Sequence, residues 1–288
     1  MAYIFDRLTG LINRGEDLPT LPTIVLRLHR VLDDPSKGAG DVAAVIEGDP
    51  ALTARLLRAA NSAAFSRGGQ AITSINAAIT RMGMNQVRAV CLVLSIVNAF
   101  AGRQKGTLDH RVFWAHSVTV ATIVAQLWDR IGLARDITPE DAYTVGLLHD
   151  VGLLILDQHF AEDLAELLQH RPDPEAELWP FEEEHLGLDH GAIAGLLLGR
   201  WSLPAVVGET VAHHHHPTSA PDSCRQLAEI VETAESLCWE AGAELPFEGR
   251  PMLTARAALE QLGIPPREVD EIIADIPKVH EKSRSFLA

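Results

Sequence analysis

Helical periodicity runs through almost all of this 288-residue chain, and it constrains the fold more than any other feature. Apolar residues recur every three or four positions, for example from Asp109 to Arg130 and from Ser223 to Ala241. The alternating pattern of a half-buried strand is not found, and aromatic residues make up only 5% of the chain, which disfavours a β-sandwich or barrel. We therefore predict an all-α fold, in which a helix from Ala161 to His170 is followed by a Pro/Glu-rich connection before His190.

The predicted helices form two lobes and a short extension. The segment from Ala101 to Thr107 (AGRQKGT) is polar and contains glycine, which is typical of a linker. We place an N-terminal helical lobe at residues 1–105, a second helical lobe at 106–245, and a C-terminal helical extension at 246–288. The most apolar stretch, Val87 to Ala101, is too short to span a bilayer. It predicts a buried core helix rather than an exposed partner groove.

Charge and cysteine content limit the expected partners and compartment. The chain has 39 acidic and 24 basic residues, a net charge of −15, and such a surface repels phosphates and anionic lipids. We therefore expect no direct nucleic-acid binding and no membrane association. The three cysteines show no CxxC spacing, which fits free thiols in a reducing cytosol. With no signal-peptide pattern at the N-terminus, the sequence predicts a cytoplasmic protein.

A set of histidines and carboxylates on apolar helices gives the strongest chemical signal. His149 and Asp150 lie in GLLHDVGLL, within a helix that we expect to run from Thr138 to about Asp157. His116 lies upstream, on the apolar face of its own helix. His190, His214, His215 and Glu235 follow downstream. The adjacent His214 and His215 lie at the end of one predicted helix, and His190 and Glu235 each lie on another. Imidazole and carboxylate are common ligands of zinc, iron and manganese.

Structural interpretations of these residues stay open. A single core histidine is usually a hydrogen-bonded structural residue, and the run His213 to His216 also suits a solvated helix C-terminus. The prediction of a metal site therefore depends on the whole set converging in a bundle core. In the N-terminal lobe, Asn61 and Ser62 end a predicted helix. They are either a C-terminal cap or a contact to a ligand or partner.

Several spaced motifs together resemble the HDOD domain family. They cover roughly residues 10 to 240, and they are LPTLP (18–22), DPALT (49–53), LLRAANSAAFS (56–66), Trp114, GLLHDVGLL (146–154), WSLP (201–204) and the HHHP that ends at Pro217. The resemblance implies a multi-helix HDOD fold, in which an N-terminal helical lobe packs on a C-terminal HD-like helical lobe. It also implies a bacterial signalling or regulatory module that binds a partner protein or a small ligand.

The resemblance extends to the metal ligands of the related HD phosphohydrolases. His116 is similar to the upstream histidine of that superfamily, His149 and Asp150 to its His-Asp pair, and Glu235 stands where its later aspartate is expected. In the two-metal HD-GYP branch, further histidines occur at positions similar to His190, His214 and His215. These residues imply one or two divalent ions, with iron, manganese and zinc as the candidates.

Two departures argue against hydrolysis of a cyclic dinucleotide. Leu153 or Leu154 stands where HD-GYP proteins carry a lysine, and the Gly-Tyr-Pro signature is absent. The resemblance therefore favours a non-enzymatic module, with a metal as an open possibility. One alternative is a metal-dependent phosphohydrolase, in which Asp150 is the candidate proton acceptor. Another is a structural metal that ties distant helices together without catalysis.

Overall fold

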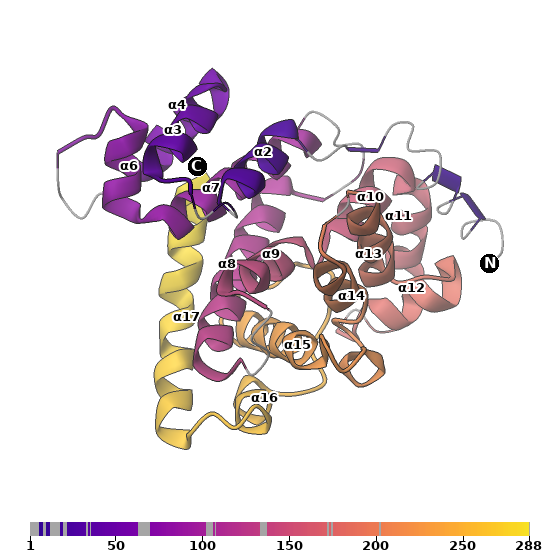
Figure 1. Ribbon diagram of the computed structural model, residues 1–288. Helices are drawn as coiled ribbons and strands as arrows, with labels where there is room; N and C mark the ends of the chain where they lie inside the picture. Colours follow the sequence, from indigo (N-terminus) through magenta and orange to yellow (C-terminus); the bar gives the residue numbers. More distant parts are fainter. Residues whose placement is uncertain are drawn as a thin grey trace. The chain divides into compact units, whose positions relative to one another are not determined.

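The computed structural model describes residues 6–7, 10–11, 18–19, 22–32, 34, 36–62, 70–101, 106, 108–132, 137–171, 173, 175–201 and 203–287. Within these ranges the chain is helical and has no strand (Figure 1), which confirms the predicted all-α class. Contacts divide the chain into a larger unit, Met1–Leu18 with Arg103–Glu281, and a smaller unit, Pro19–Gly102 with Lys282–Ala288. The domain boundaries given above stay a prediction, and most of the expected linker lies outside the described residues.

In the smaller unit, short helices begin at side-chain caps. Asp49 Oδ1 accepts hydrogen bonds from the backbone N–H groups of Ala51 and Leu52, and Ser74 Oγ accepts one from Ala77, which satisfies donors that a helix start leaves free. The helices are α2 (Thr23–Leu32), α3 (Ala39–Glu47), α4 (Pro50–Asn61), α6 (Ile75–Met82) and α7 (Met84–Phe100).

Helix α7 is the core helix that the apolar stretch predicted, since residues along its whole length from Val87 to Phe100 are buried. Among the described residues, no single helix has the length and hydropathy needed to cross a bilayer. The pair α6 and α7 meets those criteria only when taken together, and its two helices are bent by 116° at Gly83.

The larger unit is built around α8 (His110–Ile131), which is buried along most of its length and packs against α9 and α15. A second layer of contacts joins α13 to α10 and to α14. The remaining elements are α9 (Pro139–Leu148), α10 (Val151–His159), α11 (Ala161–His170), α12 (Trp179–Leu186), α13 (His190–Arg200), α14 (Ala205–Ala212), the 3-10 turn η1 (Pro217–Ser219), α15 (Arg225–Glu240), α16 (Ala255–Gln261) and α17 (Pro266–Leu287), whose residues from Lys282 on belong to the smaller unit.

Two expectations about this unit are wrong. The helix expected from Thr138 to Asp157 is broken at His149 and Asp150 into α9 and α10. The Pro/Glu-rich stretch before His190 was expected to be a connection, but it contains α12. Pro180 lies in the first turn of α12, where its missing N–H removes no helical hydrogen bond.

Helices α10 and α13 approach so closely that only glycine fits at position 152. A Cβ atom on Gly152 would lie 2.0 Å from the carbonyl oxygen of His190 and 3.1 Å from the backbone nitrogen of Ala194. Because both neighbours are backbone atoms, the two helices would have to separate. The absence of a side chain at Gly152 therefore sets the distance between Asp150 and His190, which matters for the site described below.

We expect Gly152→Ala to destabilise the protein by about 1–3 kcal/mol, because overpacking forces backbone shifts. Gly199→Ala on α13 is the matched control, since a Cβ atom there meets nothing within 4 Å and alanine favours helix. Urea denaturation of both variants measures the difference. Equal stability of the two variants would show that the α10–α13 contact tolerates a methyl group.

Candidate metal centre

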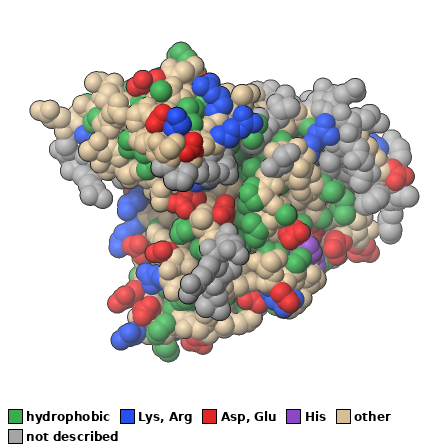
Figure 2. All heavy atoms as spheres, in the orientation of Figure 1, with side chains coloured by type: hydrophobic (Ala, Val, Ile, Leu, Met, Phe, Trp, Pro, Cys, Tyr) green, Lys and Arg blue, Asp and Glu red, His purple; other side chains and the backbone are tan. Residues whose placement is uncertain are grey.

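All seven residues predicted as metal ligands lie in the larger unit, and the structure brings their side chains together. They come from five places in the chain: His116 from α8, His149 and Asp150 from the turn between α9 and α10, His190 from the start of α13, His214 and His215 from the turn after α14, and Glu235 from α15. On the face in Figure 2, histidine is visible only as one small patch, although the chain has 13 histidines.

The break between α9 and α10 explains how adjacent residues reach one centre. Neighbouring residues of a continuous helix do not face each other. In the turn, His149 keeps helical angles and Asp150 adopts φ −98°, ψ 6°, so that His149 Nε2 lies 2.9 Å from Asp150 Oδ2. The helix that the sequence predicted would have pointed these two side chains in different directions.

Asp150 lies between two groups of side chains, and each of its oxygens faces one of them. Its Oδ2 is 2.9 Å from His149 Nε2 and 3.6 Å from His116 Nε2. Its Oδ1 is 3.2 Å from His190 Nε2 and 3.7 Å from His214 Nε2. A carboxylate placed in this way can bridge two metal ions, with one oxygen on each.

The first ligand set comprises His116, His149, Glu235 and Glu248, each with one ligand atom within 4.8 Å of the others. Glu235 Oε1 lies 3.0 Å from His149 Nε2 and 3.3 Å from His116 Nε2, and Glu248 Oε2 lies 3.8 Å from His116 Nε2. Ligands about 2.0–2.2 Å from one ion lie roughly 2.8–3.6 Å from each other. The first set therefore has nearly the spacing that a single ion requires.

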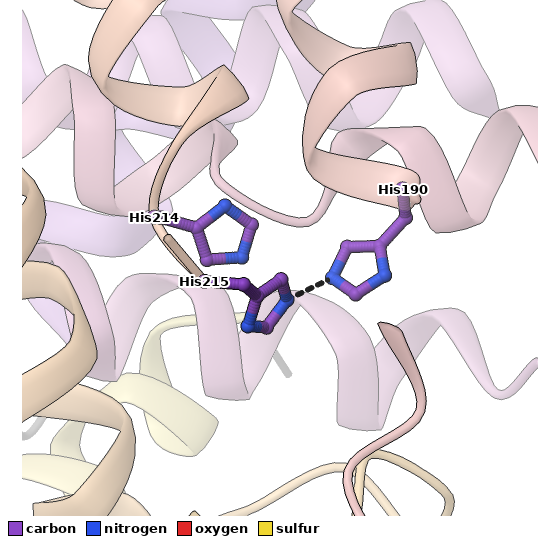
Figure 3. A group of neighbouring side chains, drawn as sticks. All are labelled: His190, His214 and His215. Atoms are coloured by element: carbon purple, nitrogen blue, oxygen red, sulfur yellow. Dashed lines mark hydrogen bonds between the residues drawn. The ribbon is translucent and has the colours of Figure 1, made fainter. Parts of the chain in front are cut away.

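The second ligand set comprises His190, His214 and His215, drawn in Figure 3. The Nε2 atoms of His190 and His215 point toward each other at 2.8 Å, and the rings of His214 and His215 lie 3.9 Å apart. Three imidazoles and Asp150 Oδ1 make a ligand group of the kind that binds zinc, iron or manganese.

Hydrogen bonds fix the orientation of four of these imidazole rings. Three rings donate from Nδ1 to a backbone carbonyl oxygen at 2.7–2.8 Å: His116 to Ala243, His149 to Gly146, and His214 to Val211. The fourth, His190, donates from Nδ1 to Glu182 Oε2 at 2.6 Å. Because each acceptor requires a proton on Nδ1, the neutral ring carries its lone pair on Nε2. That tautomer suits a metal ligand, and ligand histidines usually donate their other ring N–H to a carbonyl or carboxylate oxygen in this way.

Seven of the atoms that face the centre have no hydrogen-bond partner. These buried atoms are Nε2 of His116, His149 and His214, both carboxylate oxygens of Asp150, Glu235 Oε1 and Glu248 Oε2. Buried polar atoms without a partner cost free energy, and native proteins contain few of them. Seven such atoms gathered on the two sides of Asp150 are therefore explained best by ligands that satisfy them, and their chemistry fits divalent cations.

The pKa shifts follow from this crowding of charge. Burial lowers the pKa of His149, but the carboxylates of Asp150 and Glu235 outweigh that effect and raise it to about 9. Burial together with the charged His149 and His190 lowers the pKa of His214 to about 4. Burial and the nearby Asp150 and Glu235 raise the pKa of Glu248 well above its ordinary value. Protons thus supply the positive charge that a cation would bring.

Glu182 and Glu248 are site residues that the sequence prediction missed. Glu182 lies on α12, which was expected to be a connection, and it contacts His190. Glu248 follows α15 in a loop outside the segment expected to hold the cluster. Neither lies in a motif, so only the tertiary contacts find them.

The other histidines of the run 213–216 do not join the two ligand sets. His213 Nδ1 pairs with the carbonyl oxygen of Glu209. His216 Nε2 lies 3.5 Å from Asp189 Oδ2 and 3.6 Å from Glu183 Oε1 in a separate, more exposed group. Two of the four consecutive histidines therefore face the candidate centre.

Asn61 and Ser62 lie in the smaller unit and make hydrogen bonds to the chain itself. The Asn61 amide donates to the carbonyl oxygens of Leu57 and Ile72 and accepts from Ile72 N–H, and Ser62 Oγ donates to Ala59. These bonds are those of a helix C-terminus that also holds the segment near Ile72. The ligand or partner contact stays a prediction.

The fold and the site together define a class of helical protein, in which one helical unit holds a His-Asp pair at its centre. The HDOD domain family model matches residues 18–217. This match covers more than half of the sequence, and the chain belongs to the HDOD family.

Individual relatives agree with this assignment. An HDOD domain protein of unknown function from Geobacter sulfurreducens has a TM-score of 0.76 and 26% identity, over 97% of this chain and 99% of that one. A protein of Shewanella amazonensis SB2B, provisionally assigned as a phosphohydrolase, has a TM-score of 0.75 and 25% identity, over 97% and 96% of the two chains. An uncharacterised protein of Treponema pallidum strain Nichols is 26% identical over 242 residues. That match covers 84% of this chain, which spans about half (46%) of the length of this curated relative.

Proposed function

We propose that this protein is an HDOD signalling module whose larger unit holds two divalent metal ions, one in each ligand set, with Asp150 between them. The observation that carries the proposal is the convergence of buried ligand atoms without hydrogen-bond partners on both sides of Asp150. Nitrogen and carboxylate ligands suit iron, manganese or zinc. Such ions would tie together α8, α13, α15 and the two turns, and so stabilise the surface that a partner protein or small ligand recognises.

We infer that the module acts by binding rather than by turnover. Leu153 and Leu154, where the phosphohydrolase branch carries a lysine, are completely buried, so neither provides a cation for a substrate phosphate. Most of the histidine and carboxylate ligands are also almost completely enclosed, whereas the Glu235 side chain is 14% exposed. In this protein, His116, His149 and His190 are 0% exposed and Asp150 is 1% exposed.

A metal-dependent phosphohydrolase is the second candidate, and the bridging position of Asp150 favours it. Two-metal hydrolases use ions about 3.5–4 Å apart, and such ions lower the pKa of bound water and polarise a phosphoryl oxygen. In this chain, the two ligand sets would hold the ions, and Glu182 would keep His190 in its ligand tautomer. Asp150 would have to combine its bridging position with the role of proton acceptor.

Turnover assays separate the two candidates. The full chain, reconstituted with Mn²⁺ or Fe²⁺, is incubated with nucleotides, cyclic dinucleotides and simple phosphodiesters, and phosphate or product release is measured. The signalling proposal predicts no release that depends on His149. Turnover that His149→Ala abolishes and His170→Ala preserves would overturn it in favour of the hydrolase, since His170 lies exposed at the end of α11.

Proton release provides a test of metal loading that does not depend on activity. Because the pKa of His149 is raised to about 9, its imidazole is protonated at pH 7.5 in the metal-free chain, and an ion must displace that proton. Metal affinity should therefore rise as the pH is raised toward 9, by about tenfold per pH unit for each proton displaced. Calorimetry in two buffers of different ionisation enthalpy measures the protons released. Binding heats independent of buffer would contradict this account.

A further inference from the structure

The loop between α15 and α16 lies against the first ligand set. The carbonyl oxygen of Ala243 accepts the hydrogen bond from His116 Nδ1, and five residues later Glu248 Oε2 lies 3.8 Å from His116 Nε2. The Glu248 side chain is only 11% exposed, and its Oε2 is buried without a hydrogen-bond partner. We name residues 243–250 the capping loop.

Backbone contacts hold the capping loop to the segment between α11 and α12. Leu178 N–H donates to the carbonyl oxygen of Glu248 at 2.8 Å, and Arg171 Nη1 donates to that of Phe247 at 2.5 Å. On the far side of Glu248, Arg250 N–H donates to the carbonyl oxygen of Glu175 at 2.7 Å. These bonds fix the backbone on both sides of Glu248, from which its side chain extends toward His116.

Gly249 makes this close approach feasible. Its φ of +89° lies in the region that favours glycine, and a Cβ atom there would lie 1.9 Å from the carbonyl oxygen of Ala176. Any larger residue would push the capping loop away from the segment that holds it. Position 249, which sets the place of Glu248, therefore requires glycine.

Glu248 is one of five protein groups that face the first ion position. His116, His149, Glu235 and Asp150 Oδ2 already provide four ligand atoms. Metal sites that act on substrates keep a coordination position free for water or substrate, whereas closed sites fill it with protein ligands. In the first ligand set, Glu248 Oε2 lies 3.8 Å from His116 Nε2, so an ion held there would have a fifth protein ligand within reach.

We propose that Glu248 is a built-in ligand of the first ligand set, and that the capping loop thereby excludes oxyanions such as phosphate from the ion held there. The inference rests on the proposed metal loading, and it identifies the residue that separates a closed regulatory centre from one open to phosphate.

Cobalt provides a direct readout, because its visible spectrum reports the ligands of the ion without any turnover. The full chain is loaded with Co²⁺ and titrated with inorganic phosphate. The wild-type spectrum should not change. Glu248→Ala should retain its cobalt through the four remaining ligands and change its spectrum with phosphate, at a concentration at least about tenfold below any wild-type response. Glu260→Ala, which removes an exposed carboxylate from α16, should behave like wild type.

Gly249→Ala tests the same inference with Glu248 still present. We expect it to respond to phosphate as Glu248→Ala does, because it displaces the capping loop. Gly242→Ala is its control, since Gly242 also has a positive φ (+66°) but nothing lies within 4 Å of its added Cβ atom.

Three outcomes are distinguishable. A phosphate response limited to Glu248→Ala and Gly249→Ala supports the inference. Equal responses of wild type and variants, with cobalt bound in all, overturn the inference and leave the proposed metal loading intact. If the wild-type chain binds no cobalt, the proposed function and the inference fail together.

Discussion

Replacing Asp150 by asparagine is expected to reduce the metal content of the chain from about two ions to one or none. Each oxygen of Asp150 faces a different ligand set, with Oδ2 at 2.9 Å from His149 Nε2 and Oδ1 at 3.2 Å from His190 Nε2. Asparagine keeps one oxygen, replaces the other with an amide NH₂ that cannot ligate, and removes a negative charge between two cations. The loss should therefore affect both sites.

Asp157→Asn is the matched control for this experiment. Asp157 lies on α10, is fully buried like Asp150, and has an oxygen without a hydrogen-bond partner. Its Oδ1 accepts from Leu108 N–H, which an asparagine oxygen can also do. Metal analysis of both purified variants by mass spectrometry gives the comparison. Full metal content in Asp150→Asn, or an equal loss in Asp157→Asn, would refute a bridging role.

Removal of the metal should lower the melting temperature of the larger unit by about 10 °C. An ion present at about 1,000 times its dissociation constant stabilises the folded state by about 4 kcal/mol, and each kcal/mol corresponds to roughly 2–4 °C in a unit of this size. The physical reason is that ions would join five segments that are distant in sequence. Without them, seven buried ligand atoms lack hydrogen-bond partners.

Calorimetry with and without a chelator measures this effect. The candidate ligands all lie in the larger unit, so the transition in which this unit unfolds is the one expected to move. His149→Ala lacks a central ligand of the first set, so chelation should change its melting temperature less than that of the wild type. An unchanged wild-type melting temperature would show that the ions, if bound at all, do not stabilise the fold.

The sequence predicted the fold class and most of the candidate ligands because both depend on local information. Helical periodicity does not require knowledge of contacts, and α11 occurs at the residues expected, Ala161–His170. His116, His149, Asp150 and His190 stood out because polar groups on apolar helix faces are unusual. Their convergence could only be hypothesised, since it depends on how α8, α10 and α13 pack.

The features that the sequence did not predict depend on tertiary structure. The break at His149 and Asp150 has no glycine or proline at these two positions, and the apolar pattern continues through it. Glu248 lies in a loop whose course is set by backbone bonds to Glu175 and Leu178. Glu182 acts through His190, and its role becomes visible only when α12 is placed beside α13. Glu182 and Glu248 are thus the parts of the centre that the predicted histidine and carboxylate ligands did not include.

Anomalous diffraction from crystals of the manganese-loaded chain tests the central claim most directly. The account predicts two anomalous peaks about 3.5–4 Å apart, one on each side of the Asp150 carboxylate. The first peak should lie among His116, His149, Glu235 and Glu248, and the second among His190, His214 and His215. A map without anomalous peaks at these ligand sets, from crystals grown with excess manganese, would contradict it.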